Sequence, residues 1–248
     1  MQDHGVQEYR IQGYRRDDGT VHPPLLWPGY KSTVLRAPAQ PLVLLPHSLT
    51  EITGPVLGEG RVTEADADLT RHWSGGSVVG EAQGQRIIVH GRVVDEDGRP
   101  VPHTLVEVWQ ANAAGRYLHK ADQHDAPLDP HFTGAGRVLT DAEGRYRFLT
   151  IRPGAYPWGN HTNAWRPAHI HFSLFGRAFT QRLVTQMYFP DDPLFPHDPI
   201  MHSVRDPHAR ARMTARFDLD ATEEAYALGF EWDIVLRGRD ATPMENRP

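Results

Sequence analysis

From Arg86 onwards the chain carries short runs in which apolar and polar residues alternate, with turn residues between the runs. The first run, Arg86–Val94, ends at the turn residues 95–98 (DEDG). A period of two is typical of strands, and several short strands separated by turns are typical of a β-sandwich or barrel. Similar runs occupy residues 104–110, 168–175, 181–189 and 230–237. The pattern predicts a mainly β fold with a β-sandwich core.

Two turn or cap signals refine this prediction. Residues 141–144 (DAEG) lie between two strand-like runs, which predicts a β-hairpin. Thr63 precedes Glu64, Ala65 and Asp66 in a pattern that is typical of an N-cap, so a short helix is expected there. Residues 208–217 contain a further helical turn. The sequence therefore predicts few and short helices.

Residues 1–80 are rich in proline and glycine and show weak periodicity. The recurring prolines exclude a long helix. Leucine, valine, tryptophan and tyrosine are too frequent for a disordered tail, which is the alternative interpretation. We therefore expect two parts: an extended Pro-rich N-terminal arm, residues 1–80, which packs on the core or on a partner chain, and a β-sandwich domain, residues 81–248.

Composition restricts the possible chemistry. The chain has 248 residues, a formal net charge of -5 and no cysteine. This charge does not favour a nucleic-acid partner, and without thiolates any metal needs nitrogen and oxygen ligands. No run reaches the roughly 18 apolar residues of a membrane span. The polar amino end lacks the apolar stretch of a secretory signal, so a cytoplasmic location is expected.

The most informative short motif is His169-Ile170-His171. On a strand, residues two apart point to the same face, so the two imidazoles lie side by side. Such a pair suits a transition metal, although a purely structural pair is possible. A cupin-type site needs a carboxylate shortly afterwards, and residues 172–176 (FSLFG) contain none. A zinc site needs a third histidine, and the candidates, His119, His161, His197 and His202, are flanked by loop-forming residues.

Two tyrosines offer oxygen ligands. Tyr117 follows the strand-like run at residues 104–110, and Tyr156 lies between prolines at a strand exit. A phenol normally has a pKa of about 10, but a bound cation can remove its proton. Tyrosinate is a hard donor, so two tyrosinates with two imidazoles favour ferric iron. Each tyrosine alone could equally be a half-buried aromatic residue.

Three longer segments, residues 91–117, 140–158 and 165–172, resemble the intradiol ring-cleavage dioxygenases. The resemblance extends from about Pro24 to the carboxyl end. It implies a non-haem Fe(III) cofactor, and all four positions that match the family's iron ligands carry the right residue: Tyr117, Tyr156, His169 and His171.

Within this family, the chain most resembles the type that cleaves protocatechuate (3,4-dihydroxybenzoate) with O2 to 3-carboxy-cis,cis-muconate in the degradation of aromatic compounds. That type implies a homologous α chain without iron ligands as partner, with αβ units in a larger oligomer. Catechol and hydroxyquinol dioxygenases are alternatives, but they usually begin with a helical dimerisation segment. A non-enzymatic β-sandwich binding or assembly module is the alternative outside enzymology.

The resemblance also implies roles for other residues. Tyr156 would leave the metal and accept a substrate proton, and Arg166 would stabilise charge that develops during oxygen attack. The side chains implied to bind substrate or line its pocket are Tyr30, Trp109, Trp158, Gln186, Tyr188 and Ile200. Trp109 and Ile200 could equally belong to the core. The loop at residues 159–164 and the stretch near residues 58–60 depart from the family pattern, which leaves the details of the substrate pocket open.

Overall fold

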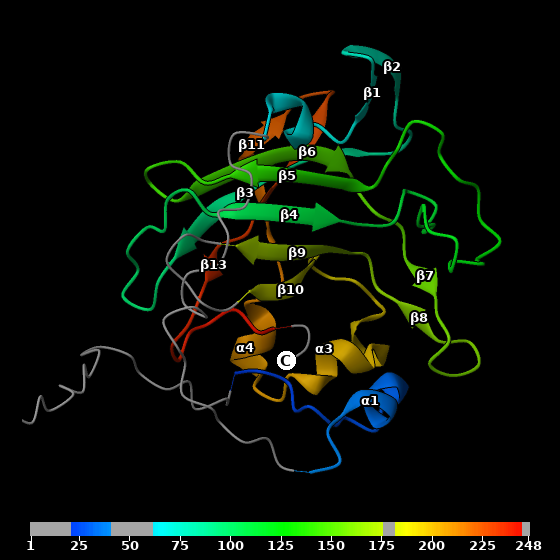
Figure 1. Ribbon diagram of the computed structural model, residues 1–248, viewed down its shortest axis with the longest axis vertical. Helices are drawn as coiled ribbons and strands as arrows, with labels where there is room; N and C mark the ends of the chain where they lie inside the picture. Colours follow the sequence, from blue (N-terminus) through cyan, green and yellow to red (C-terminus); the bar gives the residue numbers. More distant parts are fainter. Residues whose placement is uncertain (1–20, 41–61, 176–181, 245–248) are drawn as a thin grey trace, which may run out of the picture.

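Two β-sheets packed face to face form the centre of the molecule (Figure 1). The computed structural model describes residues 21–40, 62–175 and 182–244. The first sheet is antiparallel with the order β10-β9-β4-β5, and the second has the order β11-β12-β3-β13, with β6 also paired to β3. Strand β3 runs antiparallel to β6 and parallel to β12 and β13.

The strands of the first sheet are β4 (Leu105–Trp109), β5 (Ala135–Leu139), β9 (His169–Phe175) and β10 (Leu183–Tyr188). Those of the second are β3 (Arg86–Val94), β6 (Arg145–Ile151), β11 (Arg216–Glu223), β12 (Ala227–Glu231) and β13 (Ile234–Val235). Alternate residues of both sheets meet in one apolar core. Phe172 of β9, for example, is fully buried with its ring 4.7 Å from that of Trp232 and 5.9 Å from that of Phe148. The predicted mainly β sandwich is confirmed.

The prediction of a hairpin at residues 141–144 is wrong. The turn itself forms, since the Gly144 amide donates to the Asp141 carbonyl at 3.0 Å. However, β5 pairs with β4 in the first sheet, whereas β6 pairs with β3 in the second. The turn therefore crosses from one sheet to the other. Val138 of β5 and Phe148 of β6 enter the same core from opposite sheets. Burying both side chains favours strands in separate, facing sheets over a hairpin.

The predicted short helices are confirmed where the structure describes them. Thr63 precedes the 3-10 helix η2 (Glu64–Ala67), and both its backbone N–H and its hydroxyl donate to the Asp66 carboxylate at 2.8 Å. The others are α1 (Lys31–Arg36), η3 (Phe195–His197), α3 (Pro199–Ser203) and α4 (Pro207–Ala211). Among the described residues, no helix has the length and apolar character that crossing a membrane requires.

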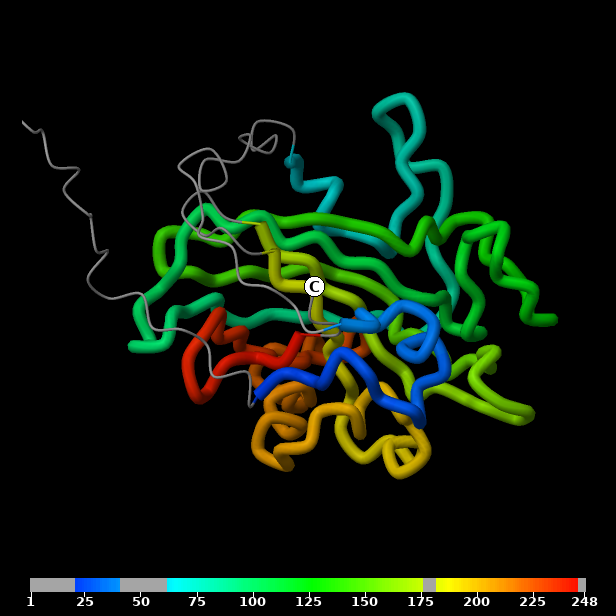
Figure 2. Tube along the Cα trace, turned by 60° about the horizontal axis from the view of Figure 1, so that its bottom comes forward, coloured from blue at the N-terminus to red at the C-terminus, as the bar shows by residue number. Residues whose placement is uncertain are grey.

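Two parts of the predicted N-terminal arm are described, and both contact the β-sandwich. Residues 62–81 include η2 and a hairpin of β1 (Arg71–Ser74) and β2 (Ser77–Glu81), and Leu69 of this segment is buried in the core. Residues 21–40 run beside the segments that carry α3 and α4, and Val21 packs in a cluster with Tyr188 and Met201 (Figure 2). Residues 1–20 and 41–61 of the predicted arm lie outside the described residues.

Candidate metal centre

Strand β9 lies in the middle of the first sheet and separates the core from a polar site. Ile170 and Phe172 are fully buried in the core, whereas His169 and His171 lie on the opposite face. Both imidazoles are buried, and their Nε2 atoms are 3.2 Å apart. The strand pattern therefore brings two ring nitrogens to one point.

The surroundings of His169 prepare its Nε2 atom to act as a ligand. Its Nδ1 atom lies 2.7 Å from the Pro167 carbonyl oxygen, so Nδ1 carries the proton and Nε2 keeps its lone pair, which Arg166 NH1 contacts at 3.0 Å. Burial, the Arg166 cation and the neighbouring His171 lower the pKa of His169 well below its ordinary value. The imidazole is thus neutral, which is the form that binds a metal.

The two predicted tyrosine ligands reach the same point from different segments. Tyr156 belongs to β7 (Tyr156–Pro157), which pairs with β8 (Trp165–Arg166), and its hydroxyl lies 3.4 Å from His169 Nε2. The ring of Tyr117 lies edge-on to the ring of Tyr156, with centroids 5.3 Å apart. The centroid of the Tyr117 ring lies 6.4 Å from that of the His171 ring. The structure brings all four predicted ligands together.

A close backbone approach explains how the tyrosines meet. Each tyrosine follows a glycine by two residues, and Gly115 and Gly154 lie where their two segments touch. A Cβ atom on Gly115 would lie 2.1 Å from the Ala155 carbonyl oxygen. One on Gly154 would lie 2.5 Å from the Ala113 carbonyl oxygen. Because side chains at these positions would push the segments apart, the glycines allow Tyr117 and Tyr156 to contact each other.

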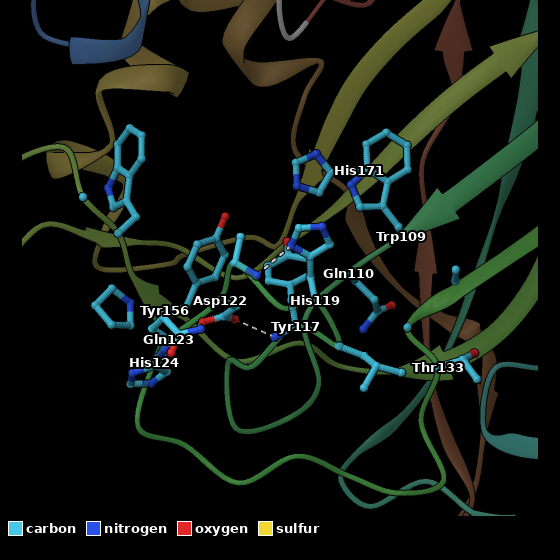
Figure 3. Close-up of a pocket in the computed structure, with 17 residues that line it drawn as sticks. Trp109, Gln110, Tyr117, His119, Asp122, Gln123, His124, Thr133, Tyr156 and His171 are labelled. Carbon is cyan, nitrogen blue, oxygen red and sulfur yellow. Dashed lines mark hydrogen bonds between the residues drawn. The ribbon is translucent and has the colours of Figure 1, made fainter.

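A cavity of about 810 Å³ opens beside the tyrosines and His171 (Figure 3). Trp109 lines it and stacks on His171, with centroids 4.7 Å apart and an interplanar angle of 4°. Strand register explains this contact, because Trp109 of β4 lies directly opposite His171 of β9. Trp158 also lines the cavity, so two of the residues predicted to bind substrate are placed on its wall.

Arg166 is almost completely buried beside the ligand cluster. Its NH1 atom lies 3.0 Å from His169 Nε2 and 3.5 Å from the Tyr156 hydroxyl. Its NH2 atom donates to Gln186 Oε1 at 2.6 Å and to the Tyr188 hydroxyl at 2.9 Å. Burial opposes the charge, but Tyr188, Asp198 and Tyr156 raise the pKa of Arg166 well above its ordinary value. The guanidinium is therefore a permanent cation next to the candidate ligands.

Asp198 is a site residue that the sequence analysis missed. Its side chain has no exposed surface, and its Oδ2 atom lies 3.0 Å from Arg166 NH2 and 3.1 Å from the Tyr188 hydroxyl. Its Oδ1 atom accepts the backbone N–H of Ile200 and caps α3. Asp198-Pro199 is a sequence signal for a helix start, but this signal does not reveal the partner.

The remaining predicted pocket residues surround this cluster. Strand pairing places Gln186 opposite His171 and Tyr188 opposite His169, and both are fully buried. Ile200 is buried in α3. The Tyr30 ring packs against that of Trp158, with centroids 5.3 Å apart. Gln186 and Tyr188 accept hydrogen bonds from Arg166, and the Ile200 backbone N–H donates to Asp198. None of the four is among the residues that line the described cavity.

The donor set fits a metal that is held by two imidazoles together with two phenols. His119, His161, His197 and His202 are all exposed, and no three His, Cys, Asp or Glu side chains gather at a metal-sized site within the described ranges. A metal here therefore needs the phenols. Two ligand atoms about 2.1 Å from one ion, at an angle of roughly 100°, lie about 3.2 Å apart. The separations of 3.2 and 3.4 Å at His169 Nε2 agree with this spacing.

Sequence comparison finds two family models along the chain. The model described as Dioxygenase matches residues 52–238, and the model described as Protocatechuate 3,4-dioxygenase beta subunit N terminal matches residues 14–48. The chain is 61% identical to the protocatechuate 3,4-dioxygenase beta chain of Burkholderia cepacia, over 92% of this chain and 95% of the relative. It is 29% identical to the protocatechuate 3,4-dioxygenase alpha chain of Pseudomonas putida, over 82% and 97% respectively.

Solved structures share the fold. The 3-chlorocatechol 1,2-dioxygenase of Rhodococcus opacus 1CP aligns with a TM-score of 0.52 and 24% identity, over 74% of this chain and 70% of the other. This likeness supports the two-sheet architecture alone.

Proposed function

The chain belongs to the intradiol dioxygenase family, and from that membership we propose that it is the metal-carrying chain of a protocatechuate 3,4-dioxygenase. The reaction is cleavage of protocatechuate by O2 to 3-carboxy-cis,cis-muconate. The observation that carries the proposal is the meeting of Tyr117, Tyr156, His169 and His171 beside a cavity large enough for a small aromatic molecule.

Tyr117, Tyr156, His169 and His171 would hold Fe(III). Phenolate oxygens and neutral imidazoles are the donors that the cluster offers, and two anionic phenolates favour the ferric state. The chemistry that ferric iron supplies at such a site is Lewis-acid activation of a catecholate towards O2. The Pro167 carbonyl, through its hydrogen bond, would keep His169 in the orientation that this role needs.

Tyr156 and Arg166 would take the catalytic roles. Tyr156 lines the cavity, so its phenolate oxygen would accept a proton from a catechol hydroxyl as the substrate binds. Arg166 stays charged, and its NH1 atom lies 3.5 Å from the Tyr156 oxygen. A cation held there would stabilise negative charge that develops on the substrate.

Aromatic walls would orient the substrate ring. Trp109 and Trp158 line the cavity, and Tyr30 supports Trp158 from the N-terminal arm. Gln186, Tyr188 and Ile200 would form the side of the O2 and substrate pocket behind the ligands. The buried Gln186 Nε2 atom has no hydrogen-bond partner among the described residues, so it is available to a ligand.

A carboxylated substrate needs a counter-charge that this cavity does not provide by itself. No lysine or arginine is among the described residues that line it. We propose that a homologous α chain completes the pocket in an αβ unit of a larger oligomer. The similarity of this chain to the protocatechuate 3,4-dioxygenase alpha chain of Pseudomonas putida supports a partner of the same fold. The arm, residues 1–80, would pack on the β domain, residues 81–248, or on that partner.

The test is O2 uptake by the purified complex of this chain with its α-type partner, loaded with iron. We expect protocatechuate to be cleaved with a higher kcat/KM than catechol or hydroxyquinol, and the protein to be red-brown from tyrosinate-to-iron charge transfer. A higher kcat/KM with catechol or hydroxyquinol would show that protocatechuate is not the preferred substrate. A colourless complex that consumes no O2 after iron loading would favour the non-enzymatic binding module.

A further inference from the structure

The Arg166 guanidinium has two unequal ends. Three acceptors, on Gln186, Tyr188 and Asp198, hold the NH2 atom at 2.6 to 3.0 Å. The NH1 atom instead contacts His169 Nε2, the nitrogen that a metal would occupy. One end of the side chain is therefore anchored, and the other reaches into the candidate metal centre.

One of the three acceptors is a carboxylate. Gln186 and Tyr188 offer an amide oxygen and a phenol oxygen from β10, whereas the Asp198 carboxylate lies at the N-terminus of α3. Asp198 is fully buried and Arg166 nearly so, so solvent does not screen their attraction. Without the carboxylate, the buried guanidinium would lose its counter-charge and interact more strongly with the other electron-rich atoms beside it, in competition with a metal ion. The nearest are His169 Nε2 and the Tyr156 oxygen.

We propose that Asp198 is a positioning residue: its ion pair anchors the NH2 end of the Arg166 guanidinium, so that NH1, which contacts His169 Nε2 at 3.0 Å without a metal, gives up that contact when iron binds. This inference rests on the proposed iron site but concerns a residue outside it. It also links the candidate centre to α3, because the same carboxylate caps that helix. Asp198 acts through Arg166 and touches neither metal nor substrate.

The test is Asp198→Asn in the complex with the α-type partner. Asparagine is as good an N-cap as aspartate and nearly the same size, so α3 keeps its start while the charge is lost. We expect iron affinity to fall about 10- to 100-fold, the range typical of outer-shell partners. The charge-transfer band should shift, and kcat should fall more than KM rises. Unchanged iron affinity would overturn the proposal.

The chain offers a matched control. Asp206 also precedes a proline and caps the next helix, α4, through the backbone N–H of His208. Asp206→Asn removes the same charge from the same kind of cap. We expect its iron affinity to stay within about twofold of the wild type, since it leaves Arg166 untouched. Equal loss of iron in both variants would assign the effect to helix capping and contradict the proposal.

A double variant, Arg166→Gln with Asp198→Asn, shows whether Asp198 affects iron binding through Arg166 or directly. It also keeps the proposal testable if Asp198→Asn alone does not fold. Removing both charges of a buried pair is often neutral for stability. If Asp198 acts through Arg166, the double variant binds iron within about threefold of the wild type, because the competing guanidinium is gone. Iron loss in the double variant would show that Asp198 acts directly. Iron binding is measured without substrate, so an inactive wild-type complex would reject the proposed reaction and leave this result interpretable.

Discussion

At the scale of single residues, the two phenols would give the proposed site at the histidine pair its preference for one metal. His169 and His171 would suit several transition metals. Tyr117 and Tyr156 add two oxygens that become anionic only when a strong cation is present. Removing one phenol therefore tests the metal identity more directly than removing one imidazole.

Tyr117→Phe removes one oxygen and little volume. In the iron-loaded complex, we expect the charge-transfer band to bleach or shift, and kcat/KM to fall by at least about 100-fold, beyond the loss typical of outer-shell partners. Visible absorption and O2 uptake measure both effects. Tyr226→Phe is the control, because Tyr226 is 40% exposed and is not part of the ligand cluster. Unchanged colour in Tyr117→Phe would remove Tyr117 from the site.

Gly115 is the residue whose lack of a side chain brings the tyrosines together. In Gly115→Ala, the new Cβ atom would strike the Ala155 carbonyl, and we expect less than half of the wild-type iron per chain. Gly98→Ala is a close control, because Gly98 has φ +76° against +77° for Gly115 but open space around it. Both variants should lose about 1 kcal/mol or more to backbone strain, but only Gly115→Ala should lose iron. Equal iron content would contradict this explanation.

At the scale of elements, one face of β9 packs in the core and stabilises the fold, whereas the other face carries the two candidate histidine ligands. Ile170→Ala should lower the free energy of unfolding by about 2 to 5 kcal/mol and leave the charge-transfer band in place while the protein is folded. His171→Ala should remove the band and cost less stability, because His171 borders the cavity instead of the core. Urea unfolding and visible absorption check both. If folded, iron-loaded Ile170→Ala lost the charge-transfer band, the two faces of β9 would not have separate roles.

The short helix η2 is tied to β5 through one carboxylate. Asp66 accepts hydrogen bonds from Thr63 and pairs with Arg137 of β5. Burial raises the pKa of Asp66, but Arg137 and Thr63 lower it by more, so the net shift is downward. A lowered folded-state pKa contributes stability above the unfolded value of about 3.9, and this contribution is lost as pH falls through the folded value.

Asp66→Ala should therefore destabilise the protein by about 1 kcal/mol at pH 7, because it removes the carboxylate that pairs with the N-cap residue Thr63 and with Arg137. The difference from the wild type should shrink below about pH 4, as Asp66 becomes protonated in the wild type. Urea unfolding at pH 7 and pH 3 measures it, with Glu64→Ala in the same helix as control. A difference that stays the same at both pH values would show that the charge of Asp66 does not stabilise η2.

At the scale of the whole molecule, the metal should join segments that are distant in the chain. The candidate ligands come from the loop after β4, from β7 and from β9, so one ion would link three segments. With free iron about 100-fold above Kd, binding stabilises the native state by about 2.7 kcal/mol. Chelation should lower Tm by about 5 to 10 °C. In calorimetry, His171→Ala should show little response to chelator; an equal response would place the stabilising metal elsewhere.

Much of the fold and site could be predicted because the signals are local. Alternation along Arg86–Val94 and residues 168–175 reports which face of each strand packs in the main apolar core, since side chains alternate with a period of two. Both strands were confirmed, and so was the common face of His169 and His171. The motif around Tyr117 and Tyr156 named further candidate ligands, which the structure brings beside the histidines.

The missed features depend on contacts between distant residues. The turn at residues 141–144 forms its hydrogen bond from Gly144 to Asp141 although the two strands it joins enter different sheets. The ion pair of Arg166 with Asp198 joins side chains that lie far apart in the chain and on different elements. Neither residue type nor spacing carries a signal for such a contact.

By itself, the sequence determined the face of β9 that carries the histidines, the start of η2 at Thr63 and the candidate donor set, because each depends on residue type and on neighbours a few positions away. Only the tertiary structure decided which sheet each strand joined, how closely the glycines let the tyrosine segments approach, and that a buried carboxylate holds Arg166. These outcomes depend on which distant segments pack against each other and become buried, and burial is a property of the whole folded chain.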